Sequence, residues 1–395
     1  MWITQRKNKS DIILSMLKDI IPFDRIWLNL HEHSFSAKAV ISFINFLERR
    51  LGAEFVYDNS RLNSESLELA NLFEIAETLH SCGVIRSYRR NYGFSDEPRT
   101  IYWNAEYHLG EGQYETAGGS SLDNQPLAFT KMIAETIERN AWFTYDGFAP
   151  FIFATINDME KKCNFLHPKN FASYTETVRG KNKRLEIRPE DSFRWISGYS
   201  WTKKMSSWVP AQIVSGHKNL RSFSPASKEP SIRASITTGI ATHPVRTSAL
   251  VSGVLEVIER DAYMITWLNQ LSLPRIDLAE LSSRNASLGE LLKICHQYGF
   301  RLHAVRLLTD APTHAVCVIL EDLSGTLPKF SIGLKAHQDP AYAVEGAMLE
   351  ALRLHQSVRR QRLSPNIKWD PSTKAVDITH YNRLMYWSEE VRSDR

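Results

Sequence analysis

The sequence contains few cysteines and no long apolar run. Its four cysteines, among 395 residues, are far apart and form no CxxC pair, which excludes a zinc ribbon and a redox dithiol. We therefore expect reduced thiols and a cytoplasmic protein. No stretch of about 20 apolar residues is present, so we expect no membrane span and no membrane partner. The first residues also lack the apolar core of a signal peptide.

A strong excess of either charge is also missing. Lys and Arg total 48 and Asp and Glu total 44, which gives a formal net charge of +4. This value is too small to indicate a protein that binds nucleic acid. The hydrophobic share of 43% and the charged share of 23% are typical of a globular chain that can bury a large core.

The common nucleotide-binding and hydrolytic motifs are absent. The chain has no GxxxxGKS/T phosphate loop, no GxGxxG, no GxSxG and no HExxH. His31 and His33 form an HxH pattern, but two histidines this close on a predicted strand are more typical of a surface than of a metal site.

The periodicity of the chain predicts two parts. Residues 10–57 predict a helix, a strand, a second helix and a second strand. Residues 64–107 predict a long helix that ends near Gly83, followed by two short strands. This winged-helix-like order could dock a partner or a peptide, or could simply pack as a subdomain. We expect an N-terminal region of residues 1–110 and a larger domain of residues 111–395.

An internal repeat organises the larger domain. Three segments, residues 122–142, 242–267 and 337–356, each combine a polar turn containing Pro with an Ala-containing helix and a Glu deep in that helix. The copies are about 100 residues apart, too far for a solenoid. Strand-like runs lie between them: FRWISGYSW, SWVPAQIV, IRASITTGIAT, FRLHAVRLL, THAVCVILED and PKFSIGLKA. This pattern predicts an α/β (α+β) fold with pseudo-symmetric subdomains that each pair a helix with strands.

Two of these helices carry the motif ExxER. Its residues are Glu135, Glu138 and Arg139 in the first copy and Glu256, Glu259 and Arg260 in the second. Residues three apart share a helix face, so the two carboxylates of each motif repel one another. Their apolar neighbours place them at the edge of the core, where a divalent cation would neutralise them. Mg²⁺ prefers such oxygen ligands, and Arg donates paired hydrogen bonds to phosphate.

An exposed helix face with ordinary ion pairs is the alternative for one motif alone. Two matched copies, with Glu350 in the third repeat, favour a metal and phosphate site instead. Two glycine-containing turns, TAGGSSLD (116–123) and ITTGIATH (236–243), precede the two ExxER helices. Glycine allows backbone amides to approach an anion closely, so these turns could contact phosphate or ribose.

These segments resemble the YcaO family over roughly residues 110–385. The resemblance is carried by GGSSLD…AETIERNAW, WVPAQIV, TTGIATH…LEVIERDAYMITW and AYAVEGAMLEAL. It implies a YcaO-type fold around a glutamate-rich pocket for ATP and Mg²⁺, without a phosphate loop. The implied reaction is cyclodehydration in a ribosomally made precursor peptide. A Cys, Ser or Thr side chain attacks the preceding carbonyl carbon, ATP phosphorylates the amide oxygen, and loss of phosphate leaves a thiazoline or oxazoline.

The resemblance also implies roles for individual residues. The metal and phosphate glutamates would be Glu135, Glu138, Glu256, Glu259 and Glu350. Arg139 and Arg260 would lie beside the phosphates as catalytic cations, and Ser120, Ser121, Thr238 and Gly239 would lie at the nucleotide. In azoline-forming members a C-terminal carboxylate reaches the active site, which here would be that of Arg395. The chain departs from the family pattern in its GGSS turn and in Lys131, which stands where the family often has Ser.

The implied partners are those of a microcin-type synthetase. They are the precursor peptide, a separate leader-binding subunit related to ubiquitin-activating enzymes, and an FMN-dependent azoline dehydrogenase. A homodimer within such a hetero-complex is also expected. Two other functions remain open from the residues: thioamide or amidine formation in the same ATP pocket, and a non-catalytic scaffold that binds a peptide or partner. The five glutamates argue against the scaffold, because a pocket without turnover has no need of them.

Overall fold

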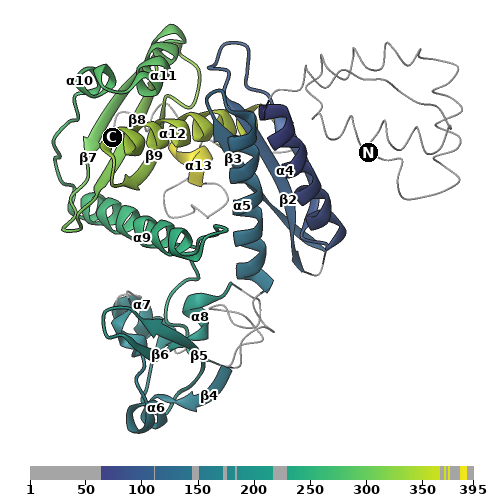
Figure 1. The fold of residues 1–395 in the computed structure, drawn as a ribbon. Coiled ribbons are helices and arrows are strands. Elements are labelled where there is room, and N and C mark those ends of the chain that lie inside the picture. The colour runs from purple at the N-terminus through teal and green to yellow at the C-terminus, as the bar shows by residue number, and fades with distance from the viewer. Residues whose placement is uncertain are drawn as a thin grey trace, which may run out of the picture. The chain divides into compact units, whose positions relative to one another are not determined.

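A computed structural model describes the fold (Figure 1). The described residues are 64–110, 112–144, 151–171, 176–182, 185–216, 229–364, 369–370, 372–373 and 383–388. The chain divides into two compact units, Met1–Cys82 and Gly83–Arg395. The elements predicted for residues 10–57, together with His31 and His33, lie outside the described residues.

The first unit is represented by helix α4 (Ser64–Ser81). The helix ends shortly before Gly83, whose φ of +74° lies in the left-handed region that favours glycine. The predicted helix and its end are therefore confirmed. The two strands predicted after it, β1 (Ile85–Asn91) and β2 (Ile101–Gly110), belong to the second unit. The expected domain boundary at residues 110 and 111 falls inside a hairpin, whereas the compact units meet at residues 82 and 83.

The first sheet is an antiparallel meander with one helix on it. Its strand order is β1-β2-β3, with β3 at Gln113–Ser121. Helix α5 (Gln125–Thr144) packs on β2 and β3 (Figure 1). Phe129 of α5 is fully buried and meets the Trp103 ring edge-on, with ring centroids 4.8 Å apart. A side chain at Gly119 would collide with the backbone of α5 at Ala128 and Met132, so glycine permits this close approach.

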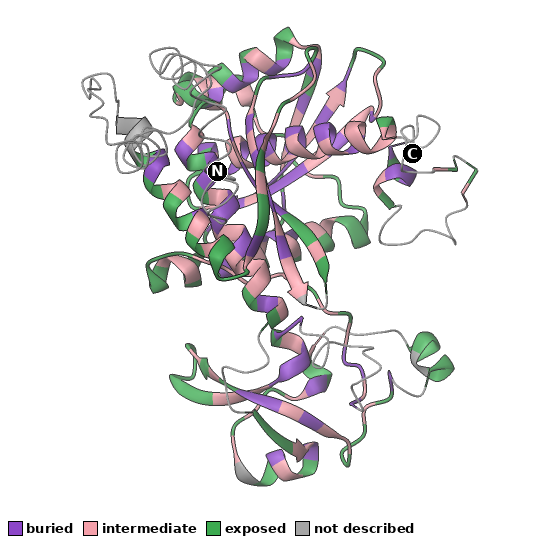
Figure 2. Cartoon of the chain, turned by 90° about the vertical axis from the view of Figure 1, so that its right-hand side faces the viewer, coloured by how far each residue is buried: buried purple, intermediate pink, exposed green. Residues whose placement is uncertain are grey.

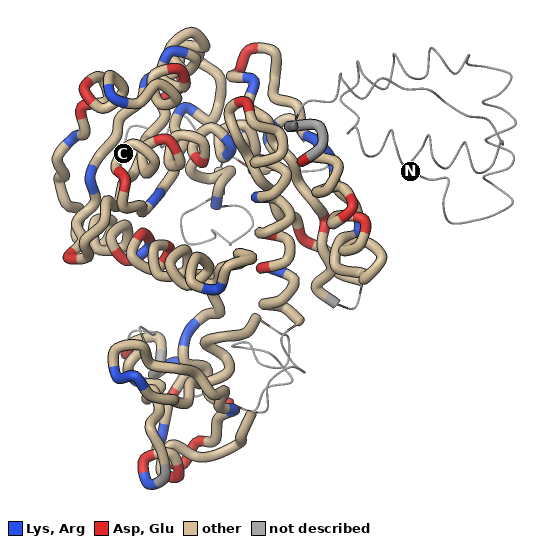
Figure 3. The backbone as a smooth tube through the Cα atoms, in the orientation of Figure 1, with Lys and Arg blue, Asp and Glu red and all other residues tan. Residues whose placement is uncertain are grey.

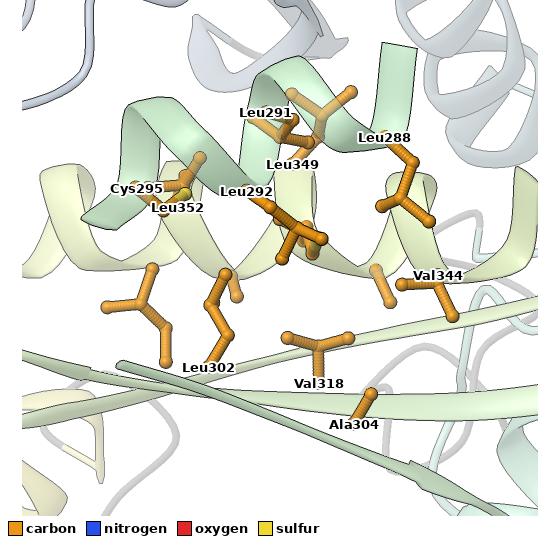
Figure 4. Packing of buried hydrophobic residues seen from close by; sticks show 14 of the residues in the cluster. Leu288, Leu291, Leu292, Cys295, Leu302, Ala304, Val318, Val344, Leu349 and Leu352 are labelled. Atoms are coloured by element: carbon orange, nitrogen blue, oxygen red, sulfur yellow. The ribbon is translucent and has the colours of Figure 1, made fainter. Parts of the chain in front are cut away.

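The last sheet is covered by helices on both faces. Its antiparallel order is β7 (Phe300–Arg306), β8 (His314–Asp322) and β9 (Phe330–His337). Helices α11 (Ala286–Gln297) and α12 (Pro340–Leu363) pack on one face, where Leu291, Val318 and Val344 join one core (Figure 4). Helix α9 (Arg246–Asn269) packs on the other face, against Cys317 and Ala336. Successive residues of each strand point to opposite faces, so this sheet has buried side chains on both faces.

The middle sheet, β4-β5-β6, forms a smaller subdomain. Its strands are β4 (Phe151–Thr155), β5 (Ser192–Ser200) and β6 (Met205–Pro210). Phe193, Trp195 and Ile232 are fully buried in its core. The shorter helices of the second unit are α6 (Ile156–Lys162), η2 (Pro168–Asn170), α7 (Glu176–Lys181), α8 (Ala211–Val214), α10 (Leu278–Ser283) and α13 (Arg383–Trp387). Figure 2 shows buried positions gathered where strands meet helices.

Most of the predicted elements are confirmed, and three segments differ. Residues 116–121, expected as a glycine turn, lie in strand β3 because they pair with β2. Residues 232–242, expected as a strand, form a loop. In SWVPAQIV the strand ends at Pro210 and a short helix follows, because proline cannot donate to a ladder.

The mixed helix and strand fold, with helix-on-sheet subdomains, is confirmed. All four cysteines are unpaired thiols, and burial raises the pKa of both Cys295 and Cys317 to about 12. Among the described helices none is long and apolar enough to cross a membrane.

Candidate functional site

Three helices each present a glutamate to a backbone amide that precedes it by 16 or 17 residues. On α5, Glu135 Oε2 accepts a hydrogen bond of 3.0 Å from the Gly118 amide. On α9, Glu256 Oε2 accepts one of 3.1 Å from Gly239, and on α12, Glu350 Oε2 accepts one of 2.8 Å from Leu334. Each bond ties one carboxylate oxygen to the backbone and so fixes the direction of the other. The sequence repeat is therefore also a repeat of geometry.

The first charge group joins α5 to Glu256 of α9 and to the loop before α9. Arg139 lies 3.7 Å from Glu135 and 3.8 Å from Glu138. Burial raises the pKa of Glu138 to about 7; Arg139 opposes this shift, whereas the charges of Glu256 and Glu135 add to it. The backbone amide of Thr242 also donates to Glu138. The carboxylates of this group, Glu135, Glu138 and Glu256, outnumber its one arginine, and a bound cation would relieve the excess negative charge.

The second charge group joins the middle of α9 to α12. Arg260 Nε lies 3.3 Å from Glu259, and its Nη2 lies 3.9 Å from Glu350. Glu259 is 5% exposed and accepts a 3.2 Å hydrogen bond from the Ala336 amide. Burial raises the pKa of Glu259 and the charge of Glu350 adds to the shift, while Arg260 and Lys335 oppose it.

Arg353 connects the two groups and was missed from the sequence. Its Nη1 atom lies 3.8 Å from Glu135 Oε2 and 3.5 Å from the Gly118 carbonyl oxygen, on the sheet of the first repeat. Burial lowers the pKa of its guanidinium, but the charges of Glu135 and Glu350 outweigh burial and raise it. Aligning the repeats on their deep glutamates gives the signal: Arg353 follows Glu350 at the spacing that separates Glu135 from Glu138. Figure 3 shows charged positions along α5, α9 and α12.

Two lysines add positive charge to the same region. Burial lowers the pKa of Lys131, and the nearby charge of Lys335 lowers it further. The Lys131 ammonium donates a 3.0 Å hydrogen bond to the Ser120 carbonyl oxygen. The charge of Lys335 also lowers the pKa of Glu259, so Lys335 lies near both Lys131 and Glu259. Lys131 therefore supplies a partly buried cation beside β3.

The polar residues predicted at the nucleotide have different surroundings. Ser121 is buried, and its hydroxyl accepts a 3.3 Å hydrogen bond from the Asn124 amide, which shapes the turn before α5. Neither Ser120 nor Ser121 contacts the glutamates among the described residues; Gly118 does instead. Thr238 and Gly239 lie in the loop before α9, where Gly239 has a φ of +90°. The loop reaches Glu256 through the Gly239 amide. Arg395 lies outside the described residues.

The five glutamates are not gathered into one cluster. No group of three or more Asp, Glu, His or Cys residues in the described part of the chain is placed to hold a metal ion. The carboxylates nevertheless fit Mg²⁺, which commonly binds through one or two carboxylates together with waters and substrate phosphates. Arg139, Arg260 and Arg353 are cations suited to phosphate oxygens. The residues present therefore fit Mg²⁺ bound together with a nucleotide triphosphate.

Comparison with curated proteins finds one partial relative. An uncharacterized protein of Methanothermobacter thermautotrophicus is 26% identical over 188 residues, which cover 46% of this chain and 47% of that protein. The chain thus matches about half the length of this relative.

Solved structures share the fold at low sequence identity. A heterocyclase in complex with substrate and cofactor has a TM-score of 0.63 at 18% identity, over 84% of this chain and 46% of that one. YcaO from Methanopyrus kandleri, bound with AMPPCP and Mg²⁺, has a TM-score of 0.54 at 17% identity, over 80% and 73%. The E. coli microcin synthetase McbBCD complex has a TM-score of 0.54 at 13% identity, over 76% and 70%.

A family model gives the assignment. The model described as YcaO cyclodehydratase, ATP- and Mg²⁺-binding, matches residues 124–395, which include every described charged residue of the two groups. The match covers more than half of the chain, and the fold agrees with that of the solved structures. The chain therefore belongs to the YcaO cyclodehydratase family, whose members bind ATP and Mg²⁺.

Proposed function

We propose that this protein uses ATP and Mg²⁺ to cyclodehydrate Cys, Ser or Thr residues of a ribosomally made precursor peptide. The side-chain thiol or hydroxyl adds to the carbonyl carbon of the preceding residue. The resulting oxygen takes the γ-phosphoryl group of ATP, and ADP leaves. Elimination of phosphate then gives a thiazoline or oxazoline. The overall change is loss of one water from the peptide and hydrolysis of one ATP to ADP and phosphate.

The observation that carries this proposal is the pair of charge groups on α5, α9 and α12. Phosphoryl transfer requires positioning and charge neutralisation more than a covalent group on the protein. Glu135, Glu138 and Glu256 would hold Mg²⁺ on one side, and Glu259 and Glu350 on the other. Bound Mg²⁺ would neutralise phosphate charge and orient the triphosphate. Arg139, Arg260 and Arg353 would bind phosphate oxygens.

The proposed partners follow from the family resemblance. We propose a separate subunit, related to ubiquitin-activating enzymes, that binds the leader of the precursor, and an FMN-dependent dehydrogenase that oxidises azolines to azoles. A homodimer within this hetero-complex and a cytoplasmic location are part of the same proposal. The microcin synthetase, whose YcaO-like fold this chain shares, is itself a multi-component complex by its name.

Mass spectrometry of a Cys-, Ser- and Thr-rich peptide tests the reaction. The peptide is incubated with this protein, the proposed partners, ATP and Mg²⁺, and phosphate release is followed in parallel. We expect loss of one water per modified residue, coupled to phosphate release. Phosphate release with another mass change would show thioamide or amidine formation instead. Neither signal, with a peptide and partners verified as competent, would show a scaffold without turnover.

The substitution Glu259→Gln tests the carboxylate assignment. The variant should abolish ATP turnover while the protein stays folded, because the buried glutamine can still accept the hydrogen bond of the Ala336 amide. The matched control is Glu280→Gln on α10, which removes an exposed carboxylate paired with Arg284. Turnover is measured by phosphate release, and folding by circular dichroism. Normal turnover by Glu259→Gln would contradict the assignment.

A further inference from the structure

A buried network of charges lies on α12 beyond the site residues. The His355 side chain is 1% exposed, and its two ring nitrogens face two carboxylates. Nε2 lies 3.1 Å from Asp322 Oδ2 at the end of β8, and Nδ1 lies 3.2 Å from Glu97 Oε1 in the connection between β1 and β2. The negative charges of these two carboxylates flank the ring and favour the doubly protonated, cationic form of His355.

Arg359 extends the network along the same helix. It donates two hydrogen bonds to Asp96, of 2.9 and 2.8 Å, and one of 3.0 Å to Glu97. Its guanidinium also lies over the Phe94 ring, 4.3 Å from the centroid. The Gln356 side chain donates to the Pro98 carbonyl oxygen, and Arg360 donates to that of Tyr92. Residues 92–98 are therefore held to α12 along its last turns.

The buried groups of this network have few alternative hydrogen-bond partners if one member is removed. Glu97 is 1% exposed, and its Oε2 atom has no hydrogen-bond partner among the described residues. His355 Nδ1 is at ion-pair distance from Glu97 but makes no aligned hydrogen bond there, so charge holds this contact. Burial lowers the pKa of His355, but Asp322 and Glu97 outweigh burial and raise it, in agreement with the geometry. Removing one charge would leave an uncompensated partner in a low-dielectric environment.

The network lies on the helix that carries Glu350 and Arg353. Residues 92–98 join β1 to β2, and β2 pairs with β3, whose Gly118 contacts both Glu135 and Arg353. Arg359 follows Arg353 by six positions, about 9 Å along the helix axis. The first sheet and α12 are thus joined twice: once in the site, through Arg353, and once through this network.

We propose that His355, Glu97, Asp322 and Arg359 are positioning residues that hold Arg353 of α12 against Glu135 and so set the affinity of the site for Mg²⁺ and ATP. This inference rests on the proposed function. The network touches none of the site glutamates and acts only through the placement of α12. Its loss should therefore weaken nucleotide binding indirectly, by allowing α12 and the first sheet to separate.

A double-mutant cycle on the full-length protein tests the inference, with Mg²⁺ and ATP as the probe and calorimetry as the readout. We expect Arg359→Gln to weaken ATP binding about fivefold in the wild-type background and to have no further effect in an Arg353→Gln background. The control Arg301→Gln removes the 3.1 Å ion pair with Glu321 on β7 and β8, and should leave affinity unchanged. If Arg359→Gln fails to fold, Glu97→Gln replaces it, because it keeps the shape of the side chain.

The outcomes separate the two proposals. Equal effects of Arg359→Gln in both backgrounds, or no effect on affinity, would overturn the positioning role, because a merely structural network lowers stability without acting through Arg353. Wild-type protein that binds no ATP in the presence of Mg²⁺ would overturn the proposed function and, with it, this inference.

Discussion

Glu138 is the residue at which stability and binding most clearly conflict. Its side chain is 16% exposed and lies near Glu135 and Glu256. Because burial and these charges raise its pKa to about 7 from 4.5, the protonated form stabilises the folded protein. That stabilisation is complete at pH values below the ordinary pKa of 4.5. It is lost as the pH rises through the raised pKa of about 7. Without a metal ion, the ionised carboxylate is a cost to the fold.

The substitution Glu138→Gln should therefore stabilise the metal-free protein at alkaline pH. In EDTA at about pH 8, we expect a gain of about 2 kcal/mol in the free energy of unfolding. The gain should shrink as the pH falls toward 4.5, where the carboxylate of the wild type is protonated. Urea unfolding across this pH range measures it. Glu280→Gln serves as the control, and a gain that does not vary with pH would contradict the explanation.

Gly333 of β9 determines how closely helix α12 can pack on the last sheet. A side chain at this residue of β9 would meet the α12 backbone at Ala347 and Ala351, which flank Glu350 on the helix. The helix can therefore lie against the sheet only because the residue is glycine. Gly119 of β3 likewise allows the backbone of α5 to approach the first sheet closely. Close packing of helix on strand brings Glu135 and Glu350 within reach of a strand amide.

The substitution Gly333→Ala should displace α12 and weaken the fold. We expect a loss of about 3 kcal/mol in the free energy of unfolding, since the added methyl group overpacks against helix backbone. Urea denaturation gives the value. The control is Gly289→Ala in α11, where an added Cβ meets only ordinary contacts, the nearest at 3.6 Å. That variant should keep or slightly raise stability; a Gly333→Ala protein as stable as its control would show that α12 has room to shift.

The second unit as a whole should respond to the nucleotide and metal together. No three carboxylates among the described residues are placed to hold a metal ion by themselves, and Mg²⁺ with a triphosphate has charges that suit both charge groups. Binding to the folded state alone stabilises it by about 2.7 kcal/mol at a ligand concentration of 100 times Kd. We expect the Tm to rise with ATP and Mg²⁺, and this rise to disappear when EDTA removes the metal.

Thermal unfolding with ATP, with Mg²⁺, and with both measures this effect. Glu259→Gln should lose most of the rise in Tm, while Glu280→Gln should retain it. An equal rise with ATP in EDTA would show that the nucleotide binds without metal, through the arginines and lysines alone.

The amino-acid pattern was sufficient to predict the Glu-bearing helices, most strands and the family. Helical and strand periodicities are local, so α5, α9, α12 and the last sheet followed directly from them. The ExxER spacing puts Glu135 and Glu138 on one helix face, and Arg139 lies within 4 Å of both in the structure. Residues 232–242 were wrongly predicted as a strand, because their alternating apolar residues match a strand. In the structure they form a loop whose backbone amides donate hydrogen bonds to Glu138 and Glu256.

Contacts between distant parts of the chain lay beyond such patterns. Arg353 meets Gly118 across 235 residues, and Gln356 meets Pro98 across 258. Nothing local in the sequence distinguishes these side chains from solvent-facing ones, and a glycine pair that suggested a turn became part of β3 once β2 was there to pair with it. Local hydrogen bonding and apolar spacing set which segments become helix or strand. Which charges become buried together depends on how those elements pack, because burial and low dielectric exist only in the folded chain.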